Sequence, residues 1–336
     1  MLASLPAAIE ARKAWTDGPH DSAFRLFHGF TEGDATLTLD VYGRTLVVHD
    51  RAEIAEGNRA RVDAVVAAVR EHLPWLRAAV WKARRARESD ARNGRVVFGT
   101  EADVQGKVRE NGVWYALSLT LNRDAGLYLD TRPLRAWARQ NLAFKRVLNT
   151  FAYTGSLGVA ARAAPAREVI QLDRNAAFLE VARRSYQLNG FAISRAHFVA
   201  RDFFADTARL RREAGLFDCV LVDPPFYAST RAGTVDLEQS PERVIDKVRP
   251  LVADGGWLVA VNNALWVSGA DWVRSLEAAS GAYMTLEAIL PVPDDARGFA
   301  VDASAAYPAD PAPFNHPTKI AVLRVRRKDG RKASGL

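Results

Sequence analysis

The chain has 336 residues, of which 49% are hydrophobic and 25% are charged. This composition is typical of globular proteins, and the length suffices for one large or two medium domains. The single cysteine, Cys219, excludes a disulfide framework and a cysteine zinc site, and we expect no bound metal. No apolar run is long enough to cross a bilayer, and no signal-peptide pattern opens the chain. We therefore expect a cytoplasmic protein.

Lysine and arginine outnumber aspartate and glutamate by 46 to 39, which leaves a net charge of +7. An excess of basic charge favours a polyanionic partner such as RNA or DNA. An arginine-rich composition also produces basic proteins that bind no nucleic acid. Charge alone does not choose between these two interpretations.

Residues 1–29 are predicted to form an N-terminal helical segment, and residues 30–105 a small α/β domain. In that domain an alternating strand over residues 35–40 turns and returns over 45–49, which indicates a hairpin. Apolar residues at helical spacing then predict a helix over residues 59–73.

A dense basic run occupies residues 82–95 of this domain. One interpretation is an electrostatic, sequence-independent anchor for phosphates, which would make residues 30–105 an RNA-binding domain. The other is a solvated loop between strands. Both interpretations stay open at this point.

Residues 106–145 are predicted to connect the two halves of the chain through a hairpin and a helix. A strand is expected over residues 114–119 and a helix over 135–141. Pro133 suits the first position of that helix, where its missing N–H has no intrahelical partner.

From residue 146 onward, strands and helices alternate as in an open parallel sheet. The apolar pair Val147-Leu148 is followed by a tight turn with Gly155 and Gly158 and then by an alanine-rich helix. Glycine lets a backbone come close to a ligand, and the helix directs its free N–H groups at that ligand. Dehydrogenases and plain packing turns share this pattern, so it does not specify a function alone.

Acidic residues follow three of the predicted strands. Asp173 follows the strand over residues 168–172, about 20 residues after the glycine turn, where an acid meets ribose hydroxyls in Rossmann-type units. Asp202 and Asp223 lie at the ends of the next two strands. Open α/β sheets bind ligands at the carboxyl ends of their strands, so these residues predict a ligand site at one edge of the sheet.

The rest of this region completes a sheet of seven strands. Further helices are predicted over residues 175–188, 241–252 and 271–279, and further strands over 256–261, 284–291 and 319–325. Residues 293–317, rich in Pro, Ala and Asp, are interpreted as a surface loop and a candidate lid. Residues 327–336 are interpreted as a basic, disordered tail.

Three motifs resemble those of class I S-adenosylmethionine (SAM) methyltransferases that modify large-subunit (23S) ribosomal RNA, in particular the cytosine-C5 and guanine-N7 enzymes. Residues 149–155, NTFAYTG, resemble the N-x-F-x-Y-T-G motif, and residues 126–132, GLYLDTR, resemble G-x-[FY]-L-D-x-R. Residues 39–43, LDVYG, resemble the V-D-x-Y-G turn of the central domain. The resemblance implies an α/β fold, with a Rossmann-like, seven-stranded SAM methyltransferase domain over residues 146–326 behind the small domain. Relatives often carry a further RNA-binding module before these motifs, which we expect this chain to lack.

The resemblance also implies SAM as the cofactor and assigns roles to matching residues. The turn is expected to face the methionine and ribose of the cofactor through Phe151, Tyr153, Thr154 and Gly155. Asp173 is expected to accept hydrogen bonds from both ribose hydroxyls, for which a carboxylate is well suited. Asp202 is expected to accept from the adenine amino group, with Phe203 or Arg174 beside the ring. Asp130 and Arg132 are expected near the pocket, or alternatively in a helix cap and a structural ion pair.

The segment Asp223-Pro224-Pro225-Phe226 resembles the [DN]-P-P-[FYW] signature of nucleic-acid methyltransferases that act on amines. Prolines donate no backbone hydrogen bond and hold the chain extended, so the carbonyls and the Asp223 carboxylate form a patch of acceptors. Such a patch suits an exocyclic amine, while Phe226 or Tyr227 stacks on a flipped base. The alternative is a rigid turn after a strand.

Cytosine-C5 methylation requires a cysteine thiolate that attacks the ring. In the C5 relatives this cysteine follows the fifth strand, where this chain has Asn262-Asn263. Cys219 falls inside an apolar strand and is expected in the core, which argues against C5 chemistry. The two asparagines resemble the guanine-N7 branch and are expected to bond a purine edge, or alternatively to cap the helix near Ser268.

The sequence therefore predicts a SAM-dependent RNA base methyltransferase that acts on guanine, at N7 or N2, in large-subunit rRNA. Its partner is expected to be RNA rather than a membrane, and its oligomeric state a monomer or homodimer. Alternatives are methylation of another base, of a protein or of a small molecule, and a nucleotide-binding module without catalysis. A dinucleotide dehydrogenase is disfavoured because TGSLG is not a full G-x-G-x-x-G motif.

Overall fold

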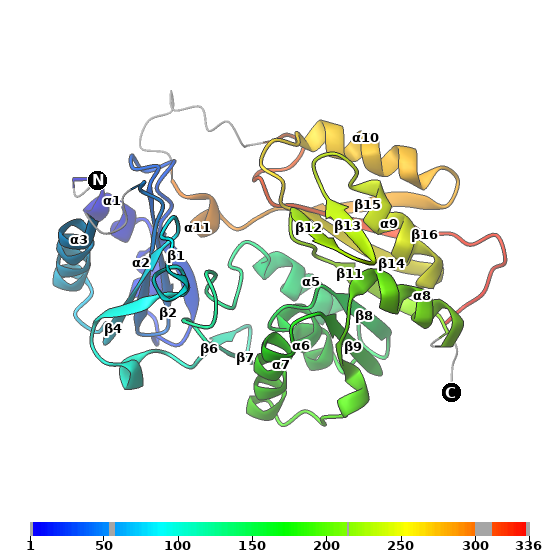
Figure 1. The fold of residues 1–336 in the computed structure, drawn as a ribbon, viewed down its shortest axis with the longest axis horizontal. Helices are drawn as coiled ribbons and strands as arrows, with labels where there is room; N and C mark the ends of the chain where they lie inside the picture. Colours follow the sequence, from blue (N-terminus) through cyan, green and yellow to red (C-terminus); the bar gives the residue numbers. More distant parts are fainter. Residues whose placement is uncertain (1–2, 54–57, 214, 300–310, 334–336) are drawn as a thin grey trace. The chain divides into compact units, whose positions relative to one another are not determined.

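The computed structural model describes residues 3–53, 58–213, 215–299 and 311–333 (Figure 1). The chain forms two compact units, one of Met1–Asp130 with Pro293–Pro308 and one of Thr131–Val292 with Ala309–Leu336. This grouping differs from the predicted one, because residues 1–29 supply an edge strand of the first unit rather than a separate helical segment. No helix in the described ranges is long and apolar enough to span a membrane.

The first unit is built on a five-stranded sheet with the order β1-β2-β3-β4-β5. Its strands are β1 (Ala23–Phe27), β2 (Leu37–Tyr42), β3 (Thr45–Asp50), β4 (Ala78–Ala83) and β5 (Arg95–Phe98). The other elements are α1 (Leu5–Glu10), α2 (Lys13–Thr16), α3 (Arg59–His72), α4 (Ser89–Asn93), η2 (Glu101–Asp103), β6 (Lys107–Glu110), β7 (Val113–Ala116) and α11 (Asp294–Arg297). The predicted hairpin over residues 35–49 is present as the antiparallel pair β2 and β3.

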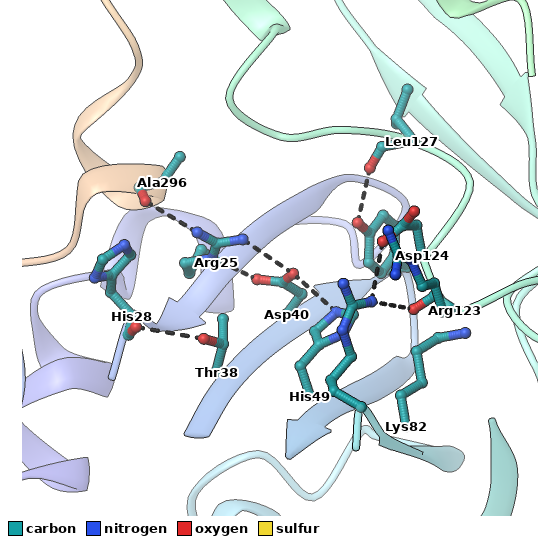
Figure 2. Close-up of polar contacts among 12 residues, drawn as sticks. Arg25, His28, Thr38, Asp40, His49, Lys82, Arg123, Asp124, Leu127 and Ala296 are labelled. Carbon is teal, nitrogen blue, oxygen red and sulfur yellow. Dashed lines mark hydrogen bonds and ion pairs between the residues drawn. The ribbon is translucent and has the colours of Figure 1, made fainter. Parts of the chain in front are cut away.

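The two faces of this sheet differ in chemistry because side chains alternate along each strand. Leu37, Leu39 and Val41 of β2 join α1 and α3 in an apolar core. Thr38 and Asp40, which alternate with them, belong to the opposite face, which carries buried polar groups (Figure 2). Tyr42 follows in the same alternation. The aspartate and the tyrosine of the LDVYG motif therefore lie on the same face of the sheet.

Asp40 is the centre of this polar face. Its Oδ1 accepts a hydrogen bond from Arg25 Nε at 2.8 Å, and its Oδ2 lies 3.3 Å from His49 Nε2 (Figure 2). Burial alone would raise the pKa of Asp40, but the charge of Arg25 and the bond from His49 hold that pKa well below its usual range. Tyr42 donates to the carbonyl of Leu127 at 2.8 Å, which connects the LDVYG motif to the GLYLDTR motif.

Lys82, predicted as part of a surface run, is fully buried in β4. Its ammonium group donates to the carbonyls of Asn93 and Asn122, and burial lowers its pKa to about 7. Arg84 pairs with Asp124 at 3.0 Å. Lys82 therefore cannot serve as a phosphate anchor. Within residues 82–95, only the exposed basic residues remain candidates for phosphate contacts.

The start of the predicted surface loop over residues 293–317 is instead a short helix, α11, that packs in the first unit. Asp295 and Ala296 of α11 are buried, the Asp295 carboxylate accepts from the backbone N–H of Arg25 at 3.2 Å, and the Arg25 guanidinium donates to the carbonyl of Ala296 at 3.2 Å. Residues 300–310, in the middle of the candidate lid, lie outside the described residues. Helix α11 therefore completes the polar face that surrounds Asp40.

The second unit is built on a seven-stranded sheet with the order β10-β9-β8-β11-β14-β16-β15 (Figure 1). Its strands are β8 (Arg146–Thr150), β9 (Glu168–Asp173), β10 (Phe198–Ala200), β11 (Phe217–Val222), β14 (Val252–Asn262), β15 (Met284–Leu290) and β16 (Lys319–Val325). The first five run parallel, whereas β16 pairs antiparallel with β14 and β15. The prediction of a Rossmann-like, seven-stranded sheet is confirmed.

Helices cover both faces of this sheet. One face packs on α5 (Arg132–Asn141) and α6 (Ser156–Ala163), and the other on α8 (Phe203–Glu213), α9 (Glu242–Val248) and α10 (Gly269–Ser280). The remaining elements are α7 (Ala176–Leu188), η3 (Arg195–His197), η4 (Arg249–Leu251) and the hairpin of β12 (Tyr227–Thr230) and β13 (Gly233–Asp236). Because both faces are buried, the strands read as apolar runs in the sequence.

Candidate functional site

The glycine turn after β8 is held by a buried pair of amide side chains. Asn149 donates to Gln171 at 2.8 Å, and Gln171 donates to the carbonyl of Gly155 at 3.2 Å. Gly155 caps α6 in a left-handed conformation with φ of +77°, and a Cβ there would stand 2.4 Å from the Cβ of Ala182. No larger residue fits at this position, so the turn keeps its close packing only with glycine.

Two residues of the NTFAYTG motif adopt an unusual backbone conformation. Phe151 and Tyr153 have φ values of +52° and +50°, which aromatic residues rarely adopt. Such strain persists only where the surroundings enforce it, and it is concentrated at functional sites. The ring of Phe151 packs on that of Phe203 with 4.4 Å between the ring centroids, and the ring of Tyr153 packs on that of Phe178 with 4.6 Å. These contacts hold both rings in place. Thr154, the next residue of the turn, is buried.

Asp173 at the end of β9 closes the turn from the other side. Its Oδ2 accepts from the backbone N–H of Tyr153 and its Oδ1 from that of Asn175, both at 2.8 Å. Burial raises the pKa of the carboxyl group, against the lowering effect of these two bonds. A carboxylate has about four acceptor positions, so two remain for a ligand. Arg174, which follows it, is exposed.

Asp202 after β10 caps the next helix. Its Oδ1 accepts from the backbone N–H groups of Phe204 and Ala205 at 2.9 and 3.2 Å. Within the described part of the chain, no hydrogen bond engages its Oδ2. Phe203 is buried in the core against Phe151. A contact of Asp202 with a ligand therefore depends on Oδ2 and stays a prediction.

The segment after β11 forms a supported, extended edge. Pro224 is buried, Pro225 is exposed, and Phe226 and Tyr227 are 53% and 56% exposed. The carbonyl of Phe226 accepts from the backbone N–H of Leu237 at 2.9 Å, which fixes the base of the β12–β13 hairpin. Sequence analysis did not predict this hairpin, whose short polar strands lack a clear apolar alternation. Asp223 is partly buried at the head of the segment.

The two asparagines after β14 have different roles. Asn262 is fully buried, donates to the carbonyl of Leu237 at 3.3 Å and accepts from the backbone N–H of Ala264 at 2.9 Å. Asn263 donates to the carbonyl of Pro224 at 3.2 Å, and its Oδ1 is buried with no partner among the described residues. Asn262 is therefore not expected to contact a purine edge, and Asn263 remains the candidate for that contact. The alternative of a helix cap is wrong, because Ser268 caps α10 itself.

Two exposed residues that sequence analysis did not single out lie on the loop after β14. Trp266 is 76% exposed and Leu265 is 54% exposed. The signal that could have found them is a bulky apolar pair directly after a predicted strand end. Lys319 is buried beneath this loop and donates to the carbonyls of Ala264 and Pro317 at 2.9 and 2.6 Å. Burial lowers the pKa of Lys319 to about 8.

The remaining predicted residues are Cys219, Asp130 and Arg132. Cys219 is fully buried in the core on the α5 and α6 face, where burial raises the pKa of its thiol far above the usual value. Asp130 ends the first unit, and Arg132 opens α5 in the second. Among the residues that the structure describes, no cluster of three His, Cys, Asp or Glu side chains could hold a metal ion.

Comparison with known proteins assigns the family. The family model for S-adenosylmethionine-dependent methyltransferases matches residues 80–297, more than half of the chain. A ribosomal RNA large subunit methyltransferase I from Erwinia tasmaniensis is 32% identical over 62% of this chain and 52% of its own length. A ribosomal RNA large subunit methyltransferase K/L from Pseudomonas fluorescens is 30% identical over 68% of this chain and 30% of its own length.

A solved structure supports the fold. A proposed methyltransferase complexed with SAH superposes with a TM-score of 0.82 at 22% identity, over 96% of this chain and 80% of that chain. The chain spans only about half to two thirds of the curated relatives it matches first, with 52%, 65% and 60% of their lengths. On the family match, this chain belongs to the S-adenosylmethionine-dependent methyltransferases.

Proposed function

We propose that this protein transfers a methyl group from SAM to a base of large-subunit ribosomal RNA, and that the base is a guanine methylated at N7 or N2. The names of its curated relatives support an RNA substrate. The net charge of +7 is compatible with one. The observation that carries the proposal is the Asp223-Pro224-Pro225-Phe226 segment beside the turn that fits the cofactor.

The carboxyl edge of the second unit fits SAM in three respects. Asp173 retains two acceptor positions for ribose hydroxyls after its bonds from Tyr153 and Asn175. Gly155 caps the start of α6, whose N–H groups suit the negative end of the methionine portion. Oδ2 of Asp202 is available for the adenine amino group. When bound, SAM supplies an activated methyl group, so the protein needs little acid–base chemistry.

The residues of the chain then have to orient the base and exclude water. The carboxylate of Asp223 and the carbonyls of Pro224 and Pro225 present acceptors to an N–H group of the base. Asn263 supports this edge through its bond to the carbonyl of Pro224, which still has a second lone pair. The exposed rings of Phe226 and Tyr227 supply faces on which a flipped base can stack.

The position of Cys219 supports N-methylation over cytosine-C5 methylation. C5 chemistry requires a thiolate beside the base, whereas the single cysteine of this chain is fully buried inside β11. Its raised pKa also keeps the thiol protonated. Methylation of another base, of a protein or of a small molecule is the alternative that the experiment has to separate.

The test is transfer of radiolabelled methyl from SAM to total RNA from a strain that lacks the gene, followed by nucleoside mass spectrometry. We expect labelled guanosine, methylated at N7 or N2. Asp223→Ala should abolish transfer and spare SAM binding, measured by the ligand-induced rise in melting temperature. Labelled 5-methylcytosine, or transfer that survives Asp223→Ala, would contradict the proposal. An absence of label in RNA with intact SAM binding would point to a protein or small-molecule acceptor.

A further inference from the structure

The loop after β14 lies next to the acceptor segment. Strands β11 and β14 are parallel neighbours, with Val222 opposite Ala260, so their carboxyl ends meet at one edge. The loops that follow are joined directly by the hydrogen bond from Asn263 to the carbonyl of Pro224 at 3.2 Å. Asn263, the first residue of this loop, is therefore a direct neighbour of the proposed base site, and Trp266 follows it by three residues.

This loop is rigidly supported although its outer side chains are exposed. The carbonyl of Ala264 accepts from the buried Lys319, and its backbone N–H donates to Asn262. Ser268 ends the loop as the cap of α10 and accepts from the backbone N–H of Asp271 at 3.0 Å. Hydrogen bonds therefore hold the loop on both sides of Trp266, at Ala264 and at Ser268.

Exposed apolar side chains gather at this edge. Of the eight large hydrophobic residues that are exposed in the described part of the second unit, four lie on the two neighbouring loops: Phe226, Tyr227, Leu265 and Trp266. A tryptophan that is 76% exposed leaves a large apolar surface in water, which is typical of binding sites.

The charged residues of the segments after β11 and β14 bear on the class of ligand. No acidic residue occurs over residues 224–235 or 263–270, and the one charged side chain in both segments is Arg231, at the exposed tip of the β12–β13 hairpin. Acidic residues border these segments at Asp223, Asp236 and Asp271, and Asp236 lies opposite Tyr227 in the hairpin. The segment that carries Trp266 has no charged side chain of its own over residues 263–270. An uncharged aromatic surface suits a nucleobase, because every base has a face that stacks on an aromatic ring.

We propose that Trp266, with Leu265 beside it, stacks on a nucleotide of single-stranded RNA that flanks the methylated base. The inference rests on the proposed RNA methyltransferase function and assigns the flanking contact to the loop after β14. Phe226 and Tyr227 then hold the target base, and Trp266 holds its neighbour, so the RNA has to be unpaired over at least two nucleotides.

The test compares Trp266→Ala with Phe144→Ala in the full chain. Phe144 is 79% exposed but precedes β8, at the opposite edge of the parallel strands. The probe is a fluorescently labelled, guanine-containing, single-stranded octaribonucleotide, with the same strand in a duplex for comparison. Loss of one stacked base should weaken binding of the single strand by roughly 5- to 150-fold in Trp266→Ala. Phe144→Ala should bind as the wild type does.

Further measurements separate stacking from a structural effect. Trp266→Phe keeps a ring and should restore most of the affinity, and SAM binding should be unchanged in all variants. Titration with the octamer should quench tryptophan fluorescence in the wild type, and that quenching should be missing in Trp266→Phe.

Equal RNA affinity of Trp266→Ala and the wild type would overturn the inference. If the wild type still methylates RNA in that case, the proposed function stands. An effect of Trp266→Ala on sedimentation alone would assign the surface to a second copy of the chain, and would also overturn it. A wild type that neither binds nor methylates RNA would overturn both proposals.

Discussion

Replacement of Gly155 by alanine should disrupt the turn that we propose as part of the cofactor site. An L-residue in the left-handed conformation costs about 1–2 kcal/mol. The added Cβ would stand 2.4 Å from the Cβ of Ala182 and 2.9 Å from Nε2 of Gln171, whereas two carbon atoms in contact are normally about 3.5–4.0 Å apart. The turn or α7 must therefore move by roughly 1 Å, and overpacking of this kind costs about 1–3 kcal/mol. Together these effects predict a loss of roughly 2–5 kcal/mol in unfolding free energy.

Gly190 provides the matched control. It has φ of +68° in the same unit, but a Cβ there would meet no atom within 4 Å. Gly190→Ala should therefore show the conformational cost alone, about 1–2 kcal/mol. The gain from a less flexible unfolded chain is the same in both variants and cancels in their difference.

Two assays measure the outcome. Equilibrium urea unfolding, followed by far-ultraviolet circular dichroism, should show Gly155→Ala less stable than Gly190→Ala by about 1–3 kcal/mol. Calorimetric titration with the demethylated cofactor should show binding that is weakened more than tenfold in Gly155→Ala and unchanged in Gly190→Ala. Equal stability and equal affinity in the two variants would refute the argument from close packing.

Three further predictions concern single side chains. Asp173→Ala removes the bond from Tyr153 that holds the turn, together with the local bond from Asn175, and should abolish the rise in melting temperature on SAM addition; a retained rise would contradict its role. Cys219→Ala should cost about 1 kcal/mol in the core and keep methyl transfer to RNA; loss of transfer with intact SAM binding would restore C5 chemistry as a candidate. Burial lowers the pKa of Lys82 to about 7, so the unfolded chain binds more protons between about pH 7 and 10 and stability should rise across that window. Lys82→Met should flatten this rise in urea titrations at stepped pH, and an unchanged slope would contradict the assignment.

Much of the second unit could be predicted from the sequence. Strands buried on both faces read as short apolar runs, so the observed β9 and β16 lie close to their predicted ranges. Gly155 and Asp173 could be paired by their spacing alone, because a strand, a turn and a helix of ordinary length bring them together. The NTFAYTG and DPPF motifs could also be recognised from the sequence, because each consists of consecutive residues.

The tertiary structure decided which side chains are accessible. Asn262 and Asn263 are adjacent and chemically identical, yet one is fully buried and the other bonds Pro224. Lys82 is buried although its basic neighbours suggested a surface run, and α11 returns to the first unit some 270 residues after the strand it contacts. Trp266 is exposed although tryptophan is usually well buried.

The physical reason for this division is the range of the interactions. Turn conformation and apolar periodicity depend on residues within a few positions of one another, so a sequence determines them directly. Burial of one particular side chain depends on the register between strands such as β14 and β16, where Asn262 lies opposite Lys319. A shift of one residue in that register would exchange the inner and outer side chains of the whole strand, and the contacts that prevent it come from segments far apart in the chain.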